Sequence, residues 1–193
     1  MEDFVKSRLN PQFNNGYYAS ILDKDNDSLQ QKSIRNSRIM FRSASKAATM
    51  EGIDIDCISF DEYDRIGGEA ELSGKESLAS SKYGYIRRWS TPTVPDWGID
   101  KLYKESNQMA WLIRCDHCGY EQKMDYVKNI ELVDESGIDE IGKIVLPGTY
   151  RFVCQRCNKP LDSSRWYNGH WEEMAPGKNR RHGYQITQLD AVN

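Results

Sequence analysis

Four of the five cysteines are arranged as two C-x-x-C pairs, Cys115-Asp-His-Cys118 and Cys154-Gln-Arg-Cys157. Four thiolates at this spacing can complete a tetrahedral zinc shell, with each pair supplying two ligands from one tight turn. Gly119 and Asn158 directly follow the pairs, and these residue types best tolerate the left-handed backbone of such a turn. We therefore predict a zinc site with these four cysteines as ligands. Four sulfur ligands leave no open coordination position, so the expected role of the zinc is structural.

Other interpretations of the cysteines remain open at this point. The C-x-x-C pairs could be redox-active, or the cysteines could share no site at all. His117 lies between two of the expected ligands and could compete for the metal, although a histidine exposed in the turn is the simpler interpretation. Cys57 has no partner in the pattern, and we expect it to be a small buried hydrophobic residue in a strand.

Two adjacent carboxylates, Asp61 and Glu62, follow the apolar segment 53–60, which has the composition of a strand. Carboxylates at the carboxyl end of a buried strand lie where ligands bind in open α/β sheets. In ATPases, the first carboxylate of such a pair helps to hold Mg²⁺, and a neighbouring carboxylate orients the attacking water. The alternative is an ordinary acidic turn that is exposed to solvent.

A second predicted strand, 85–89, ends in the sequence Ser90-Thr91-Pro92. In ATPases of this kind, a hydroxyl-bearing segment on the neighbouring strand lies beside the γ-phosphate and senses hydrolysis. The alternative is an ordinary strand-to-loop exit, because serine, threonine and proline all favour turns.

The chain contains no phosphate-binding loop of the pattern G-x-x-x-x-G-K-[ST]. Residues 68–77 superficially resemble that pattern, but the spacing from Gly68 is one residue too long. Glu76 also occupies the place of the hydroxyl that would bind Mg²⁺.

Length and composition limit the possible classes of protein. The 193 residues carry a formal net charge of −3, with 38% hydrophobic and 28% charged residues, which is typical of a globular domain with a small subdomain attached. Without a general excess of basic residues, any contact with DNA must come from a local patch. The segment 178–182 is a candidate patch, although a solvated loop is the simpler interpretation. No apolar run is long enough to span a bilayer and no signal peptide is present, so we expect no membrane partner and a cytoplasmic location.

These patterns together predict an α/β fold. A mostly parallel sheet carries the acidic pair, and a small β-rich, zinc-ribbon-like subdomain follows it. Expected strands cover 37–43, 53–60, 85–89, 126–133 and 143–152, an expected helix covers 100–108, and 111–114 leads into the zinc subdomain. The Gly/Ser-rich segment 67–82 lacks large apolar residues and is predicted to be a mobile loop.

The order of these features resembles the large terminase subunit of tailed bacteriophages, in the lambda-type branch whose ATPase carries an inserted cysteine module. The resemblance covers residues 4–190 and rests on several segments besides the cysteine pairs. These segments are Arg38-Ile-Met-Phe-Arg-Ser-Ala-Ser45, Glu51-Gly-Ile-Asp-Ile-Asp56, Phe60-Asp-Glu-Tyr-Asp-Arg65, Ser90-Thr-Pro-Thr93, Leu102-Tyr-Lys-Glu-Ser-Asn-Gln108, Gly169-His-Trp171 and Gly183-Tyr-Gln-Ile186.

The resemblance implies a P-loop-ATPase-like fold and a motor that couples ATP hydrolysis to driving viral DNA into a capsid. Asp61 would be the Walker B carboxylate at the magnesium site, and Glu62 would activate the attacking water. Ser90 and Thr91 would belong to the segment that couples hydrolysis to DNA movement. In the intact protein the implied cofactors are ATP and Mg²⁺. The implied partners are double-stranded DNA, the small terminase subunit and the portal of the procapsid, in the host cytoplasm.

Members of this family carry their phosphate-binding loop upstream of the matching region and a nuclease domain downstream of it. The chain is therefore expected to be a middle portion that is inactive as an ATPase by itself. In this interpretation 1–110 is the C-terminal part of the ATPase domain, 111–165 is the zinc subdomain, and 166–193 returns to the ATPase domain. Two alternatives remain: a helicase-like ATPase fragment, because Asp61-Glu62-Tyr63-Asp64 fits D-E-x-D, or a stand-alone zinc module that contacts DNA or protein.

Overall fold

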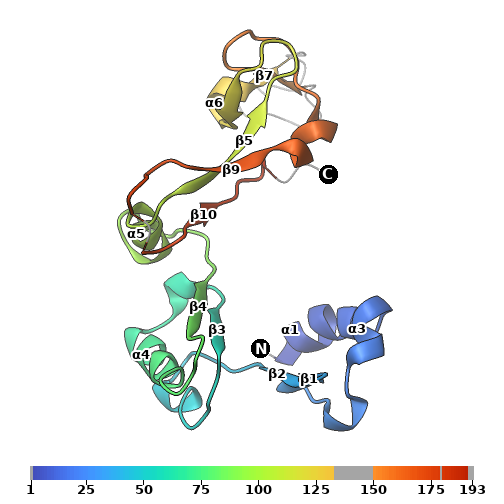
Figure 1. The fold of residues 1–193 in the computed structure, drawn as a ribbon, viewed down its shortest axis with the longest axis vertical. Helices are drawn as coiled ribbons and strands as arrows, with labels where there is room; N and C mark the ends of the chain where they lie inside the picture. Colours follow the sequence, from blue (N-terminus) through green and yellow to red (C-terminus); the bar gives the residue numbers. More distant parts are fainter. Residues whose placement is uncertain (1, 133–149, 179, 191–193) are drawn as a thin grey trace, which may run out of the picture. The chain divides into compact units, whose positions relative to one another are not determined.

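The computed structural model describes residues 2–132, 150–178 and 180–190 (Figure 1). The chain divides into two compact units, Met1–Thr93 and Val94–Asn193, and each has its own hydrophobic core. The described residues form a mixed α/β structure built from small sheets, which agrees with the predicted class. No helix in the described part of the chain is both long enough and apolar enough to cross a membrane.

The first unit opens with short helical segments. These are α1 (Glu2–Phe4), the π-helix η1 (Val5–Leu9), α2 (Asn10–Phe13), α3 (Gly16–Ile21) and the 3₁₀ helix η2 (Lys24–Asn26). They lead into an antiparallel hairpin of β1 (Gln31–Ile34) and β2 (Ser37–Met40). Lys32 of β1 is buried, and its ammonium group pairs with the carboxylate of Asp27, so the buried charge is compensated.

The acidic pair lies in the second half of this unit, which is built on two parallel strands. The 3₁₀ helix η3 (Ala47–Thr49) precedes β3 (Cys57–Phe60), and β3 pairs in parallel with β4 (Tyr85–Arg88). Parallel neighbours need a crossover connection, and here it contains the 3₁₀ helix η4 (Tyr63–Arg65) and α4 (Gly68–Glu76).

Side chains of β3 alternate between the core and the open face. Ile58 and Phe60 are buried in a cluster with Met50 and Leu78, whereas Cys57 is exposed. The expectation that Cys57 is a buried hydrophobic residue is therefore wrong. Because successive residues of a strand point to opposite faces, the two larger apolar side chains take the core face and Cys57 takes the other.

The prediction of a mobile loop over 67–82 is also wrong, because α4 occupies much of this segment. A Cβ atom added at Gly74 would lie 2.6 Å from Cδ1 of Ile58 and 3.0 Å from Cζ of Phe60. Glycine at this position lets the helix approach β3 closely. The small residues that suggested a loop are thus explained by close packing between helix and strand.

The second unit is organised around β5 (Met109–Arg114), which follows α5 (Gly98–Lys104). Three strands pair with β5: β6 (Glu121–Lys123) and β9 (His170–Glu173) antiparallel, and β10 (Tyr184–Gln185) parallel. Its core contains Ile113 of β5 together with Met124, Trp166 and Leu189. Residues near the C-terminus of the described chain therefore complete the same core as β5.

A smaller sheet of the second unit lies next to the cysteine pairs. It contains β7 (Ile130–Leu132) and β8 (Tyr150–Phe152), which pair antiparallel, and the 3₁₀ helix η6 (Ser163–Asn168) follows. The strand predicted over 126–133 begins instead with α6 (Tyr126–Asn129), because the Asp125 carboxylate accepts from the N–H groups of Val127 and Lys128 and caps a helix. The predicted turn 134–137 and most of the predicted strand 143–152 lie outside the described residues.

Candidate functional site

The segments that follow β3 and β4 leave the parallel pair at the same edge. We call residues 61–64 the acidic turn and residues 90–93 the hydroxyl segment. The N–H of Trp89 donates to the carbonyl oxygen of Phe60 at 2.8 Å, and the N–H of Tyr63 donates to that of Trp89 at 3.0 Å. The structure thus brings the segment with Asp61 and Glu62 next to the segment with Ser90 and Thr91, as expected for parallel neighbours.

Both carboxylates of the acidic pair are exposed to solvent. Glu62 has left-handed backbone angles, φ 51° and ψ 45°, which cost on the order of 1–3 kcal/mol in a residue other than glycine. Its N–H donates to Oδ1 of Asp61 at 3.1 Å, and its carboxylate lies 3.7 Å from Arg65. Strained positions of this kind are concentrated at functional sites. Chemically, two accessible carboxylates can ligate a hard cation and orient a water molecule.

Asp64, which the sequence analysis did not select as a site residue, is the buried carboxylate of the acidic turn. Its Oδ2 accepts from the N–H of Thr93 at 3.0 Å and from the Thr93 hydroxyl at 3.1 Å. The N–H of Asp64 donates to the hydroxyl oxygen of Ser90 at 3.2 Å. Asp64 is the fourth residue of the D-E-x-D pattern, which could have marked it as a site residue. The pattern does not reveal that Asp64 contacts the hydroxyl segment.

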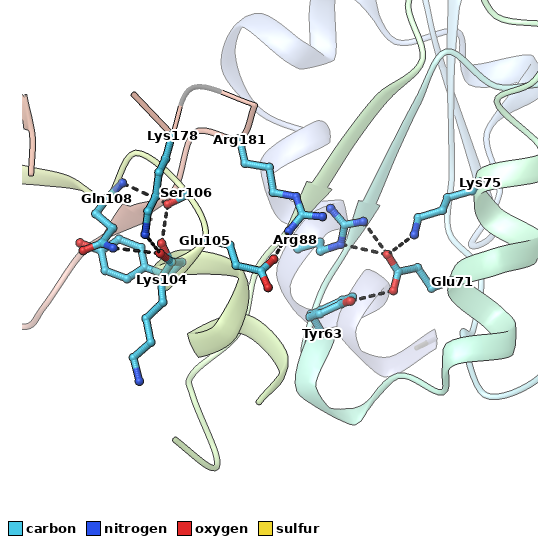
Figure 2. Close-up of polar contacts among 11 residues, drawn as sticks. Tyr63, Glu71, Lys75, Arg88, Lys104, Glu105, Ser106, Gln108, Lys178 and Arg181 are labelled. Atoms are coloured by element: carbon cyan, nitrogen blue, oxygen red, sulfur yellow. Dashed lines mark hydrogen bonds and ion pairs between the residues drawn. The ribbon is translucent and has the colours of Figure 1, made fainter. Parts of the chain in front are cut away.

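A second polar network joins the acidic turn to β4 through α4 (Figure 2). The Tyr63 hydroxyl donates to Glu71 at 2.7 Å, and Arg88 donates to the same carboxylate at 2.5 Å. Lys75 lies 2.9 Å from Glu71, and the Arg88 guanidinium lies over the Tyr63 ring. Burial acts to raise the pKa of Glu71, but the donors Tyr63, Arg88 and Lys75 lower this pKa to about 2. Glu71 is therefore an ionised structural centre of the first unit.

The four cysteines predicted to bind zinc converge in the second unit. Their Sγ atoms all lie within 4.8 Å of one another. The two pairs form equivalent turns: the N–H of Gly119 donates to the carbonyl of Cys115 at 2.9 Å, and Asn158 donates to that of Cys154 at 2.9 Å. Gly119 (φ 71°) and Asn158 (φ 55°) both have the left-handed backbone that the sequence predicted.

The spacing of the sulfur atoms fits a tetrahedral metal ion. Cys115 and Cys157 have Sγ atoms 3.8 Å apart, and those of Cys118 and Cys154 are 3.7 Å apart. A tetrahedron with zinc–sulfur bonds of about 2.3 Å has edges of about 3.8 Å. None of the four is in a disulfide. Four thiolates in this arrangement are the donor set that zinc prefers.

Protonation within the cluster is uneven. Burial acts to raise the pKa of the Cys154 thiol, but the backbone N–H groups of Cys157 and Arg156 lower this pKa to about 6. The N–H of Tyr120 acts to lower the pKa of Cys118, but desolvation and the other cysteine sulfurs raise it to about 11. One thiolate is therefore already favoured near neutral pH, and a bound cation would favour the others.

A buried amide network, which we call the amide clasp (Gln122, Asn129 and Gln155), supports the cluster. Both N–H bonds of the Asn129 side chain are used, one to Gln122 Oε1 at 3.0 Å and one to the carbonyl of Val153 at 2.8 Å. Its Oδ1 accepts from Gln155 Nε2 at 2.7 Å and from the N–H of Asp125 at 2.8 Å. Gln155 belongs to the second cysteine turn, so the clasp ties that turn to β6 and α6. Nothing in the sequence pattern indicated these contacts.

The basic segment 178–182 makes several contacts inside the second unit, some of which Figure 2 shows. They join Lys178 Nζ to the carbonyl of Lys104 at 2.9 Å, Arg181 to Glu105 at 2.6 Å, and His182 Nδ1 to the Asn107 amide at 2.9 Å. These side chains therefore hold the C-terminal segment near the end of α5. The predicted contact with DNA at this segment stays a prediction.

Comparison with known proteins gives one informative result. A family model described as phage terminase large subunit gpA, ATPase domain, matches residues 1–175. No curated protein and no solved structure matches the chain.

Proposed function

Since the chain belongs to the phage terminase large subunit gpA ATPase-domain family, and therefore to the machinery of phage DNA packaging, we propose that it is part of the motor ATPase that couples ATP hydrolysis to DNA movement. The observation that carries this proposal is the common edge of β3 and β4. There, two exposed carboxylates follow one strand and the hydroxyl segment follows its parallel neighbour.

In this proposal Asp61 is a ligand of the magnesium ion that accompanies ATP, and Glu62 orients the attacking water. Mg²⁺ would supply charge neutralisation at the phosphates. Both side chains are accessible, and carboxylate oxygens are the ligands that Mg²⁺ prefers, so the residues present fit the group. Ser90 and Thr91 follow the neighbouring strand and would sense the state of the nucleotide.

The acidic turn alone cannot hold a nucleotide tightly. Most of the grip on phosphates in such ATPases comes from the backbone N–H groups and the lysine of a phosphate-binding loop. We propose that this loop is provided by another part of the intact protein. The 193-residue chain by itself should accordingly show no appreciable ATP hydrolysis.

We further propose that the four cysteines bind one structural zinc ion. The sulfur spacing and the equivalent turns support this role, and four protein ligands leave no position for a substrate. Double-stranded DNA, the small terminase subunit and the portal are proposed partners of the intact motor, in the host cytoplasm.

Substitution of Glu62 tests the proposed catalytic role. In a protein that carries the phosphate-binding loop, Glu62→Gln should keep ATP binding and lose about 10²–10⁴-fold in hydrolysis, because the charge that orients water is removed. Asp61→Asn should weaken nucleotide affinity as well as the rate. Steady-state turnover and equilibrium binding of ATP measure the two effects separately.

Glu51→Gln is the matched control, because Glu51 is also exposed in the first unit but precedes β3. Its turnover should equal that of the unchanged protein. Hydrolysis by Glu62→Gln at the rate of this control would remove the acidic pair from the catalytic assignment.

The compact cysteine cluster favours a second candidate function, a zinc module that contacts DNA or protein without hydrolysis. The two proposals differ in what the intact protein does with ATP. Zinc binding with no ATP binding by the intact protein would favour the second candidate.

A further inference from the structure

The hydroxyl segment is joined to the acidic turn through one buried carboxylate. Asp64 is 7% exposed, whereas Asp61 and Glu62 in the same turn are open to solvent. Oδ2 of Asp64 receives two hydrogen bonds from Thr93, and the backbone N–H of Asp64 donates to the Ser90 hydroxyl. One residue thus contacts both ends of the hydroxyl segment.

The backbone hydrogen bonds that join β4 to β3 and the acidic turn end at Trp89. The N–H of Trp89 donates to Phe60, and the carbonyl of Trp89 accepts from Tyr63. Beyond that residue, the hydrogen bonds to Asp64 hold Ser90 and Thr93 to the acidic turn. The hydroxyl segment forms no helix or strand, so side-chain contacts determine where Thr93 lies.

The network around Glu71 differs from this contact in its chemistry. Glu71 contacts the cations Arg88 and Lys75 as well as the Tyr63 hydroxyl. These contacts tie Tyr63 to the end of β4. Thr93 offers Asp64 two neutral donors, a backbone N–H and a hydroxyl. The Asp64–Thr93 contact thus joins the two segments directly, whereas the Glu71 network joins Tyr63 to β4 through α4.

We propose that Asp64 is a positioning residue that joins the acidic turn to the hydroxyl segment, so that a displacement of Asp61 and Glu62 is passed to Thr93. The inference rests on the proposed function of the acidic pair and names the contact through which that pair acts. The N–H of Glu62 donates to Asp61, and Arg65 and Ile66 close η4 by backbone bonds, so residues 61–66 are connected to one another.

The contact can be tested on the 193-residue chain by amide hydrogen exchange. Asp64→Ala should speed exchange at the Thr93 amide by at least about 10-fold, because its charged acceptor is removed. The Trp89 amide, bonded to the Phe60 carbonyl, is the internal reference and should change much less. Asp64→Asn keeps an acceptor oxygen and should restore part of the protection. Equal acceleration at both amides, or none at Thr93, would overturn the proposal.

The role in coupling is tested in the intact motor through Thr93. Thr93→Val keeps the shape of the side chain and removes the hydroxyl donor, whereas Thr93→Ser keeps the donor. We expect Thr93→Val to lower the length of DNA packaged per ATP hydrolysed, and Thr93→Ser to restore it. An unchanged ratio for Thr93→Val would contradict the inference. The hydrogen-exchange measurement requires no ATP, so its outcome does not depend on the outcome of the Glu62→Gln experiment.

Discussion

The cysteine cluster gathers all four of its expected ligands within one unit, with Cys115 and Cys154 buried, whereas the acidic pair offers two carboxylates that are exposed to solvent. Around the cysteines, two equivalent turns hold the two pairs, and the amide clasp ties the second turn to β6 and α6. Around Asp61 and Glu62, the supporting residue Asp64 is buried and Tyr63 and Glu71 are half-buried, but the two carboxylates of the acidic pair face solvent. The difference indicates a site that is complete in itself and a site that needs further groups.

Removal of the metal should give the largest effect, because zinc bound by four thiolates contributes directly to the folding free energy of the second unit. Free energies of zinc binding to small modules are on the order of 10 kcal/mol, and this energy is also folding energy. We expect one zinc per chain, and we expect chelation or Cys154→Ser to abolish cooperative unfolding of the second unit. Metal analysis and calorimetry measure both effects.

Cys57→Ser is the control for that prediction, since Cys57 is exposed in the first unit. It should keep one zinc and the same melting behaviour. A Cys154→Ser protein with full zinc content would show that the cysteine cluster is not the zinc site.

Loss of the amide clasp should be the next largest effect. Asn129→Leu leaves the Val153 carbonyl without the donor that Asn129 provides, and it removes one hydrogen bond each from Gln122 and Gln155, which keep other partners. An unpaired buried carbonyl costs about 1–3 kcal/mol and each lost hydrogen bond about 1 kcal/mol, so we expect unfolding free energy to fall by on the order of 3–5 kcal/mol and zinc affinity to fall with it. Lys128→Leu, exposed on the same helix, should change both quantities little.

Acid should weaken the first unit through Glu71. Its folded-state pKa, about 2, lies below the ordinary value of 4.5, so its stabilising contribution is complete above about pH 5. That contribution is lost as pH falls toward 2, and its upper size is on the order of 3 kcal/mol. Denaturant unfolding at both pH values should show this dependence in the unchanged chain and a weaker one in Glu71→Gln. Equal slopes in the two proteins would contradict the assignment.

The smallest effect concerns the close approach of α4 to β3. Gly74→Ala adds a methyl group 2.6 Å from Ile58, which should cost about 1–3 kcal/mol, partly offset by the better helix propensity of alanine. A net loss of about 1 kcal/mol is expected from thermal or denaturant unfolding. At Gly68 no heavy atom lies within 4 Å of the added Cβ, so Gly68→Ala should be neutral or slightly stabilising.

The sequence predicted the parts of both sites that depend on local spacing. Two C-x-x-C pairs and their left-handed turn residues indicated the cysteine cluster. An apolar strand pattern before Asp61 indicated that the acidic pair lies at the end of a strand. These features can be recognised because each is determined by neighbours along the chain.

The sequence did not predict features that depend on contacts between distant residues. Helix α4 looked like a loop because its small residues pack on β3, a contact that no local pattern reports. The bond between Asp64 and Thr93 and the clasp around Asn129 likewise join segments far apart in the chain. Position 57 was assigned to the wrong face because composition alone does not fix the phase of a strand.

The pairing of β7 with β8 has a consequence for how the protein can be engineered. Leu132 and Tyr150 are direct partners across the two strands, so the last described residue of β7 and the first of β8 are adjacent. A flexible insert between two adjacent points carries an entropy of closure that rises by only about 0.6 kcal/mol for each doubling of its length. A fluorescent reporter on flexible linkers, spliced in between these partners, should therefore cost little stability and leaves all four cysteines in place.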